Sequence, residues 1–448
     1  MDKIPSSLRY NASKIMMRTN NFLIRPSGTD SGGPNSIFRM VLPERSLVEL
    51  SSLQLIFDAT FANLVAGANF YNVKMPSVHK LIRAIRVYIG GQLVSGGQSN
   101  AYDILYQALL KSTGSEDYLF SRVESGFQDL LGKADELGDF DAAPAGTSKS
   151  MHYVHTDLLG VFRSGEQTII DTSLWGNIEI EVTMNSLAGI QRKKGGNDGA
   201  ADNVAVTFSN FSCRVNCITQ ISPLYNEVLN VRLNDKGQPL RLPYMNFITN
   251  ILAGNNKSSI EVNSACVDSL LFAPLQSTYD SGTLLLAANN PPNANANRYI
   301  FNTGRTRDDA NTATLYAQVG SEQWPRSAYT NALDIAPATT QAFWGESADS
   351  RSLLYQSIST TASGTPAVQT YSRDNFLSTN FVWVVPFSSS KEGYRTKILS
   401  GLDTANQSIQ MSINQTNLIP AGGFAFVAAL TTSMLVYNTD SQSVSVVL

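Results

Sequence analysis

The side chains best suited to hold a metal ion are two histidines three residues apart, His152 and His155. The remaining histidine, His79, is distant in the sequence, and no cysteine lies near the pair. A structural zinc site normally takes four protein ligands, so two histidines alone are insufficient. We therefore interpret His152 and His155 as ordinary polar residues of a loop, and we predict no metal site and no cofactor.

Cys213 and Cys217 are the next candidates for paired chemistry, because they are four residues apart in a segment with the pattern of a β-strand. Residues at this spacing share one face of a strand but lie about 13 Å apart, at ~3.3 Å per residue. That separation is too wide for a disulfide or a shared metal ion. We predict two small core residues. With Cys266 the chain has three cysteines, which excludes a disulfide scaffold.

Acidic residues gather in one segment between glycines, namely Asp135, Glu136, Asp139 and Asp141. Their oxygen atoms suit calcium, but their spacing is not that of an EF-hand, so we favour a solvated acidic loop. The chain has no G-x-S-x-G, G-x-x-x-x-G-K-[ST] or H-E-x-x-H motif. Any carboxylate pair chosen for glycoside hydrolysis would be arbitrary. We predict that the protein is not an enzyme.

Basic residues gather at two places. Arg192–Lys194 lies in a segment rich in glycine, asparagine and aspartate, which favours a solvated hairpin tip over a DNA contact. The first 25 residues have one acidic side chain, Asp2, and five basic ones, namely Lys3, Arg9, Lys14, Arg18 and Arg25. Two interpretations of this segment stay open, which are a frayed terminus and an arm that contacts another molecule.

The composition is unusual in its charge. Only 15% of the 448 residues are charged, against about 25% in ordinary soluble domains. With 43% hydrophobic residues the chain is not of the disordered class. The net charge of −3 gives no basic excess typical of a nucleic-acid binder. The N-terminus has no apolar stretch typical of a cleaved signal peptide, so we expect synthesis inside the cell without secretion.

Most periodic segments alternate apolar and polar residues with a period of two, as half-buried strands do. The clearest example is Ile178–Met184, and Gly90-Gly91 has the composition of a tight hairpin turn. Helical periodicity is confined to residues 100–111 and, more weakly, 126–137. Two long segments, 113–160 and 277–350, have little strand pattern. The sequence predicts an all-β protein with one or two short helices and long inter-strand loops.

The order of strand-like segments in the first half is repeated faintly in the second. Residues 168–185 and 396–414 have similar patterns, and each is followed by a long β-rich stretch, 204–221 and 424–437. The break falls near Ser222-Pro223. We predict two tandem eight-stranded jelly-roll β-barrels, the first over residues 21–221 and the second over residues 222–448, preceded by an N-terminal arm of residues 1–20.

Two segments resemble a known family. They are Ile85–Val94, a strand with a glycine turn, and the helical segment Tyr102–Lys111. They resemble the first jelly roll of the double jelly-roll major capsid proteins of the adenovirus and tectivirus lineage, most of all those of polinton-like viruses and virophages. The resemblance implies a homotrimer of pseudo-hexameric shape that tiles an icosahedral shell of a virion around a DNA genome. The implied partners are other capsomers, penton proteins and minor capsid proteins.

In that setting the basic arm would lie beneath the shell. The candidate contact residues Lys3, Arg9, Lys14 and Arg18 would then face packaged DNA, an internal membrane or a neighbouring subunit. Low charge also agrees with a shell protein, because the cores of protein interfaces are depleted in charge. The main alternative is a β-sandwich adhesin or a carbohydrate-binding fibre or spike protein, and an enzyme on a β-scaffold ranks third.

Overall fold

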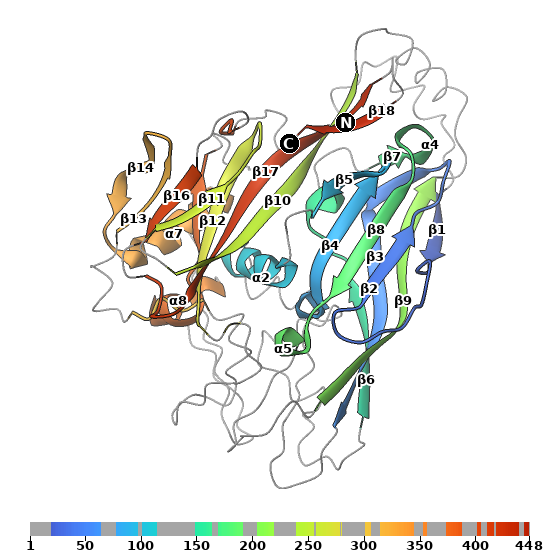
Figure 1. Cartoon of the computed structure of the whole chain (residues 1–448), viewed down its shortest axis with the longest axis horizontal. Coiled ribbons are helices and arrows are strands. Elements are labelled where there is room, and N and C mark those ends of the chain that lie inside the picture. Colours follow the sequence, from blue (N-terminus) through green and yellow to red (C-terminus); the bar gives the residue numbers. More distant parts are fainter. Residues whose placement is uncertain are drawn as a thin grey trace.

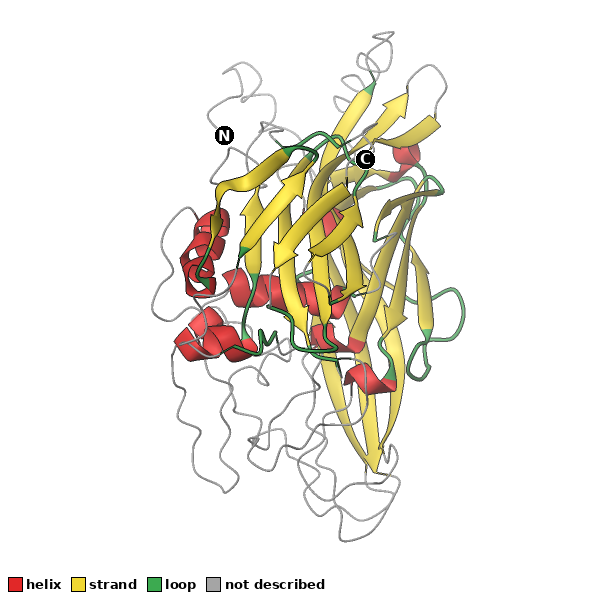
Figure 2. Ribbon diagram, turned by 60° about the vertical axis from the view of Figure 1, so that its left-hand side comes forward, coloured by secondary structure: helices red, strands yellow, loops and turns green. Residues whose placement is uncertain are grey.

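The computed structural model describes residues 19–63, 78–96, 101–113, 148–163, 169–190, 204–218, 239–254, 257–277, 279, 301–305, 314–344, 353–355, 373–387, 401–404, 410–415, 418–438 and 443–447. These residues form two β-barrels that stand side by side, with a helix between them (Figure 1). The prediction of an all-β protein is confirmed. Figure 2 shows that strands make up most of the described ribbon, with helices beside and between the sheets.

The first barrel consists of two antiparallel sheets. Its strands are β1 (Thr19–Ile24), β2 (Ile37–Val41), β3 (Leu47–Asn63), β4 (Ile82–Ile89), β5 (Gln92–Ser95), β6 (Ser148–His155), β7 (Ile169–Asp171), β8 (Ile178–Met184) and β9 (Val204–Ile218). One sheet has the order β1-β9-β3-β6, with β7 also on β3, and the other has the order β2-β8-β4-β5. Without the short β7, this interleaving of eight strands between two sheets is that of a jelly roll.

The second barrel repeats this arrangement. Its strands are β10 (Leu240–Ala253), β11 (Lys257–Glu261), β12 (Val267–Leu275), β13 (Leu315–Val319), β14 (Glu322–Tyr329), β15 (Trp383–Pro386), β16 (Gln410–Gln415), β17 (Phe424–Asn438) and β18 (Ser443–Val447). The sheets have the orders β10-β17-β12-β15 and β11-β16-β13-β14, and β18 adds to β17. Strand β11 therefore occupies the place in the second barrel that β2 occupies in the first.

The alternating pattern of the sequence explains the cores of the barrels. On β8, Ile178, Ile180 and Val182 are fully buried and face the interior. Between the two sheets of the first barrel, the ring of Phe38 on β2 stacks on that of Phe211 on β9, with centroids 4.2 Å apart. The predicted turn at Gly90-Gly91 joins β4 to β5, and both glycines have positive φ, at 57° and 79°.

The helices are short. They are α2 (Tyr102–Thr113), α4 (Thr172–Trp175), α5 (Leu187–Ile190), α7 (Ile335–Trp344) and α8 (Arg373–Thr379), with the 3-10 turns η1 (Val78–Leu81), η5 (Gly160–Arg163), η8 (Ala332–Asp334) and η9 (Leu353–Tyr355). Helix α2 matches the predicted helix at residues 100–111, whereas the weaker helical segment at 126–137 lies outside the described residues. In the described part of the chain, no helix is long and apolar enough to cross a membrane.

Two expectations about loops were wrong. The segment 113–160 contains β6, and the segment 277–350 contains β13, β14 and α7. Strand β6 lacks an apolar stripe because its buried face includes His155, and β14 is an edge strand with a proline. The predicted boundary between residues 221 and 222 lies in the undescribed segment between β9 and β10, so the exact domain limits remain a prediction.

Candidate assembly surfaces

The two histidines that the sequence singled out lie on β6 and not in a loop, so that prediction was wrong. Because they are three residues apart on a strand, their side chains point to opposite faces. His152 is exposed, and its Nδ1 lies 2.6 Å from Oδ1 of Asp58. His155 is fully buried, and its Nε2 lies 2.8 Å from the hydroxyl oxygen of Tyr102. The two imidazole rings therefore cannot share a metal ion.

The two cysteines of β9 are core residues, as predicted. Cys213 and Cys217 are both fully buried, and neither forms a disulfide. Burial raises the pKa of the Cys213 thiol to about 12, and the neighbouring Cys217 adds to this effect. Both thiols are therefore protonated at neutral pH and poor nucleophiles.

Several predicted features lie outside the described residues. They are the arm residues Lys3, Arg9, Lys14 and Arg18, the acidic segment with Asp135, Glu136, Asp139 and Asp141, and the basic tip Arg192–Lys194. Arg25 is described and is exposed directly after β1. The roles given to the undescribed residues stay predictions.

The large apolar side chains that face solvent have a common location. Among the described residues, six such side chains are between 39% and 55% exposed, namely Leu23, Ile37, Val41, Leu93, Ile169 and Val447. They belong to β1, β2, β5, β7 and β18, and each of these strands lies at an edge of its sheet. Single exposed apolar residues are common on proteins, but their concentration on sheet edges is informative, because an edge offers unpaired backbone groups to another chain.

These five strands also lack the charges that normally protect a sheet edge. Their only ionisable side chains are Arg39 on β2 and Asp171 on β7. Asp171 is buried, and its carboxylate accepts a hydrogen bond from the backbone N–H of Ser173 at 2.9 Å, which caps α4. It therefore gives the edge no exposed charge.

Arg39 is ion-paired, although its side chain is 62% exposed. Its Nη2 lies 2.9 Å from Oε2 of Glu181 on β8, whose other carboxylate oxygen lies 2.7 Å from Nη1 of Arg86 on β4. The strand register places these three residues side by side across the outer face of the sheet. Glu181 is buried beneath the two guanidinium groups. Strand β2 therefore shows two apolar side chains, Ile37 and Val41, on either side of the ion-paired Arg39.

The edge strands β11 and β14 of the second barrel, which correspond to β2 and β5, carry exposed charges, whereas the added edge strand β18 carries none. Strand β11 presents Lys257 and Glu261 to solvent. Strand β14 presents Glu322 and Arg326 and contains Pro325, which cannot donate a backbone hydrogen bond. The two barrels therefore share one topology but differ in the surface that their edges show.

A second surface, the one between the barrels, is already occupied within the chain. The hydroxyl of Tyr244 on β10 donates a 2.8 Å hydrogen bond to the carbonyl oxygen of Val94 on β5. Nearby, the rings of Trp175 and Tyr437 meet edge to face, with centroids 5.8 Å apart. Helix α2 lies in this junction and is buried over nearly its whole length.

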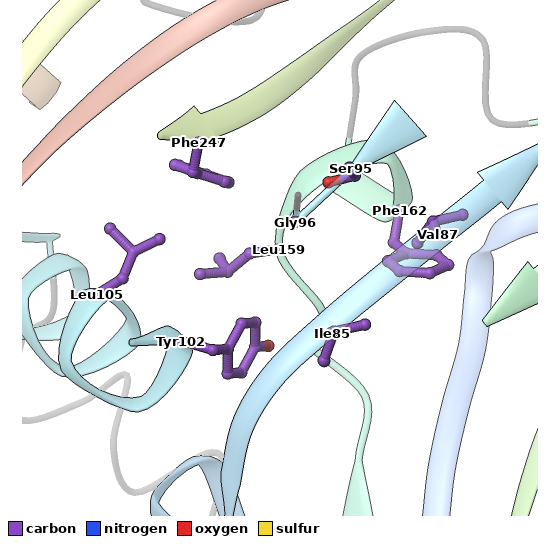
Figure 3. A pocket seen from close by; sticks show the side chains of 9 residues that line it. All are labelled: Ile85, Val87, Ser95, Gly96, Tyr102, Leu105, Leu159, Phe162 and Phe247. Carbon is purple, nitrogen blue, oxygen red and sulfur yellow. The ribbon is translucent and has the colours of Figure 1, made fainter. Parts of the chain in front are cut away.

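A small cavity marks the same junction (Figure 3). Its lining residues are Ile85, Val87, Ser95, Gly96, Tyr102, Leu105, Leu159, Phe162 and Phe247. Its volume is about 20 Å³, whereas pockets for organic ligands are about 300 Å³ or larger. The cavity has room for a single water molecule and is a packing feature of the junction.

Comparison with known proteins gives a result for the fold alone. No family model and no curated protein matches the sequence. Among solved structures, PBCV-1 VP54, in the crystal structure fitted into a cryo-EM reconstruction of the virophage Sputnik, matches with a TM-score of 0.58 at 9% identity, over 97% of this chain and 98% of that one. The Faustovirus major capsid protein matches with a TM-score of 0.54 at 8% identity, over 97% and 94%.

The cryo-EM structure of the Sputnik virophage also matches, with a TM-score of 0.51 at 12% identity, over 96% of this chain and 88% of that one. The chain has the double jelly-roll fold. The resemblance drawn from Ile85–Val94 and Tyr102–Lys111 is thus confirmed at the level of the fold. The sequence did not show which strands lie at sheet edges, because their uncharged composition becomes meaningful only once the order of strands in the sheets is known.

Proposed function

We propose that this protein is a structural virion protein, a major capsid protein whose copies trimerise into pseudo-hexameric capsomers. These capsomers tile an icosahedral shell around a DNA genome. The role is one of self-assembly, without catalysis. The observation that carries the proposal is that exposed apolar side chains and unprotected edges coincide on the double jelly roll.

Unprotected sheet edges are a hazard for a protein that works as a monomer, because they invite pairing with other chains. They are expected where the edges are covered in the working assembly, since interface cores are apolar and poor in charge. The low content of charged residues in the whole chain, 15%, also fits a molecule that has much of its surface against other copies.

The arrangement of the barrels favours a ring. One chain brings two similar barrels side by side (Figure 1), so that three chains bring six. The edge of the first barrel formed by β1 and β2 differs from the protected edges β11 and β14 of the second barrel. Contacts between two unlike surfaces close into a ring when the rotation between subunits permits it. The solved capsid structures of the same fold support this use of the barrels.

The proposal includes the partners expected from the sequence. These are neighbouring capsomers, penton proteins and minor capsid proteins, within the virion. The basic arm with Lys3, Arg9, Lys14 and Arg18 is proposed to contact packaged DNA, an internal membrane or a neighbouring subunit on the inner side of the shell.

Size-exclusion chromatography with light scattering tests the proposal on the full-length protein. We expect a particle of three times the chain mass of 48.6 kDa, or larger shells. A stable monomer that binds glycans would contradict the proposal and favour the adhesin alternative. Deletion of residues 1–18, which ends before β1, is expected to leave the trimer intact and to impair shell formation. Failure of the shortened chain to fold would show instead that these residues belong to the core.

A further inference from the structure

The junction between the barrels contains a polar stripe on a buried helix. Asp103, Gln107 and Lys111 follow one another at intervals of four residues along α2, so they lie on one face of the helix. All three are at most 3% exposed. Such groups are costly to bury and must be matched by their surroundings.

Each member of the stripe contacts a different part of the molecule. The Asp103 carboxylate accepts a 2.9 Å hydrogen bond from Nδ2 of Asn185, which follows β8. Oε1 of Gln107 lies 2.9 Å from Nε2 of His79 in η1. Lys111 reaches the second barrel, where its amine donates a 2.6 Å hydrogen bond to the carbonyl oxygen of Thr379 at the end of α8.

Lys111 is held at this position by a second contact as well. Its amine lies 4.5 Å from the centre of the Phe301 ring, in the distance range of cation–π contacts. Thr379 and Phe301 both belong to connections between β12 and β15 of the second barrel. Helix α2 therefore links η1 of the first barrel to the second barrel through buried polar groups.

The charges around η1 are mostly basic. His79 and Lys80 belong to η1, Lys111 belongs to α2, and His155 ends β6, and all four are buried. The acidic groups on this side are Asp103 of α2 and Asp157, which accepts a 3.1 Å hydrogen bond from the hydroxyl of Tyr106. Arg83, Arg86 and His152 are the other basic residues with described side chains on β4, β6 and α5, which also pack against η1; Arg86 pairs with Glu181, and His152 is exposed.

We propose that this cluster makes the junction an acid-sensitive latch, in which a proton taken up by His79 loosens α2 from η1 while both barrels stay folded. His79 is fully buried, and its ring stacks on that of Tyr106 with centroids 4.9 Å apart. A positive ring there would add a charge beside Lys80 and beside the second buried histidine of this site, His155.

The pKa of His79 agrees with this geometry. Burial lowers that pKa well below its ordinary value of 6.5, and the charge of Lys80 lowers it further, although the Gln107 contact opposes the shift. When the junction opens, the ring returns to water and regains its ordinary pKa. Opening then takes up a proton below pH 6.5, so each further unit of acidification raises the ratio of open to closed molecules by up to about tenfold.

The described centres of the barrels are mainly apolar. On β3, Leu55 and Phe57 are fully buried, and on β17 the stretch Ala425–Ala429 is fully buried. Two other contacts of the junction, the Tyr244 hydroxyl bond and the edge-to-face pair of Trp175 and Tyr437, contain no group that titrates in mild acid. Loosening should therefore begin at α2 and η1.

Hydrogen exchange followed by mass spectrometry tests the latch on the full-length protein, with rates corrected for the intrinsic effect of pH. Between pH 7 and pH 5, protection of peptides covering 78–81 and 102–113 should fall by about tenfold or more, while peptides from β3 and β17 keep theirs. The variant His79→Gln should lose most of this response. His152→Gln, which changes a surface histidine of β6, should keep it.

The variant Lys80→Met covers the case in which His79→Gln does not fold. Removal of the Lys80 charge brings the pKa of His79 closer to its ordinary value, so the response should be smaller than in the unaltered protein. The proposal is wrong if protection at α2 does not change with pH, if His79→Gln keeps the full response, or if protection falls equally in both barrels. None of these readouts depends on capsomer formation, so the latch and the assembly proposal can fail separately.

Discussion

Strands β2 and β11 occupy the same place in the two jelly rolls, but their outer faces differ. Strand β2 shows Ile37, Arg39 and Val41 to solvent, and β11 shows Lys257, Ser259 and Glu261. In both strands the exposed residues alternate with buried ones in the same pattern, so both strands pack against their barrel core in the same way. The difference must therefore arise from what lies outside each barrel, and we infer that β2 is covered in the assembly.

The rows beside these strands differ in the same way. In the first barrel the register aligns Arg39, Glu181 and Arg86 across three strands. In the second barrel the equivalent row is Ser259, Ser412 and Gln318. An ion-paired row fixes the orientation of the long side chains on this face. Fixed geometry is useful on a surface that must fit another molecule.

The largest expected effect comes from giving β2 the charges of β11. The double variant Ile37→Lys and Val41→Glu should reduce capsomer formation by at least tenfold, because it places charges in an apolar contact. Its free energy of unfolding as a monomer should change by only about 0.5 kcal/mol, since both positions are exposed. Light scattering measures the first quantity and denaturant unfolding the second.

The matched control changes β11 in the same manner. Ser259→Lys with Glu261→Lys alters exposed positions of the equivalent strand and should leave assembly unchanged. Loss of assembly in this control but not in the β2 variant would reverse the assignment of the two edges.

The second effect concerns the ion-paired row. Glu181→Gln leaves two guanidinium groups around a neutral amide and should reduce the free energy of unfolding by about 1–3 kcal/mol, given the partial exposure of both arginines. Ser259→Ala, at an exposed position of the equivalent row, should cost less than about 1 kcal/mol. Urea unfolding of the two variants measures both values, and equal losses would show that the charged row has no special role.

The third effect concerns the contact between barrels. Tyr244→Phe removes the hydroxyl that donates to the carbonyl oxygen of Val94 and should cost about 1 kcal/mol. Hydrogen exchange should report this loss at β5 and β10 first. A loss confined to the core of either barrel would mean that the bond does not contribute to the junction.

The smallest expected effect concerns the reactivity of the buried cysteine thiols in both barrels. Burial raises the pKa values of Cys213 and Cys266 to about 12, so less than about one in a thousand of these thiols is ionised at pH 8. A thiol reagent at that pH should react with none of the three cysteines of the native protein and with all three after denaturation. Fast labelling of Cys213 in native protein would show that β9 opens readily.

The sequence was sufficient to predict the strands that have one buried apolar face. Ile178–Met184 alternates cleanly and forms β8, and Gly90-Gly91 forms the turn that its composition predicts. Strand β6 was missed because its inward residues, Met151, Tyr153 and His155, include a histidine that Tyr102 satisfies only in the folded protein. Hydrophobic periodicity cannot detect a polar core residue whose partner is distant in the sequence.

The candidate assembly surfaces were harder to predict from the sequence than the strands. Edge positions follow from the pairing of β1 with β9 and of β2 with β8, which are far apart along the chain. The low content of charged residues was visible in the sequence, but the sequence did not show which surfaces of the folded protein lack charge. The same holds for the cluster around His79, because η1, α2 and β6 meet only through the tertiary fold.

Electron microscopy of the purified full-length protein tests the central claim most directly. The account predicts three-fold symmetric, pseudo-hexagonal capsomers of three chains, in which β1 and β2 of the first barrel are covered by a neighbouring copy. Isolated single chains, or assemblies in which β1 and β2 face solvent while β11 and β14 are covered, would contradict it.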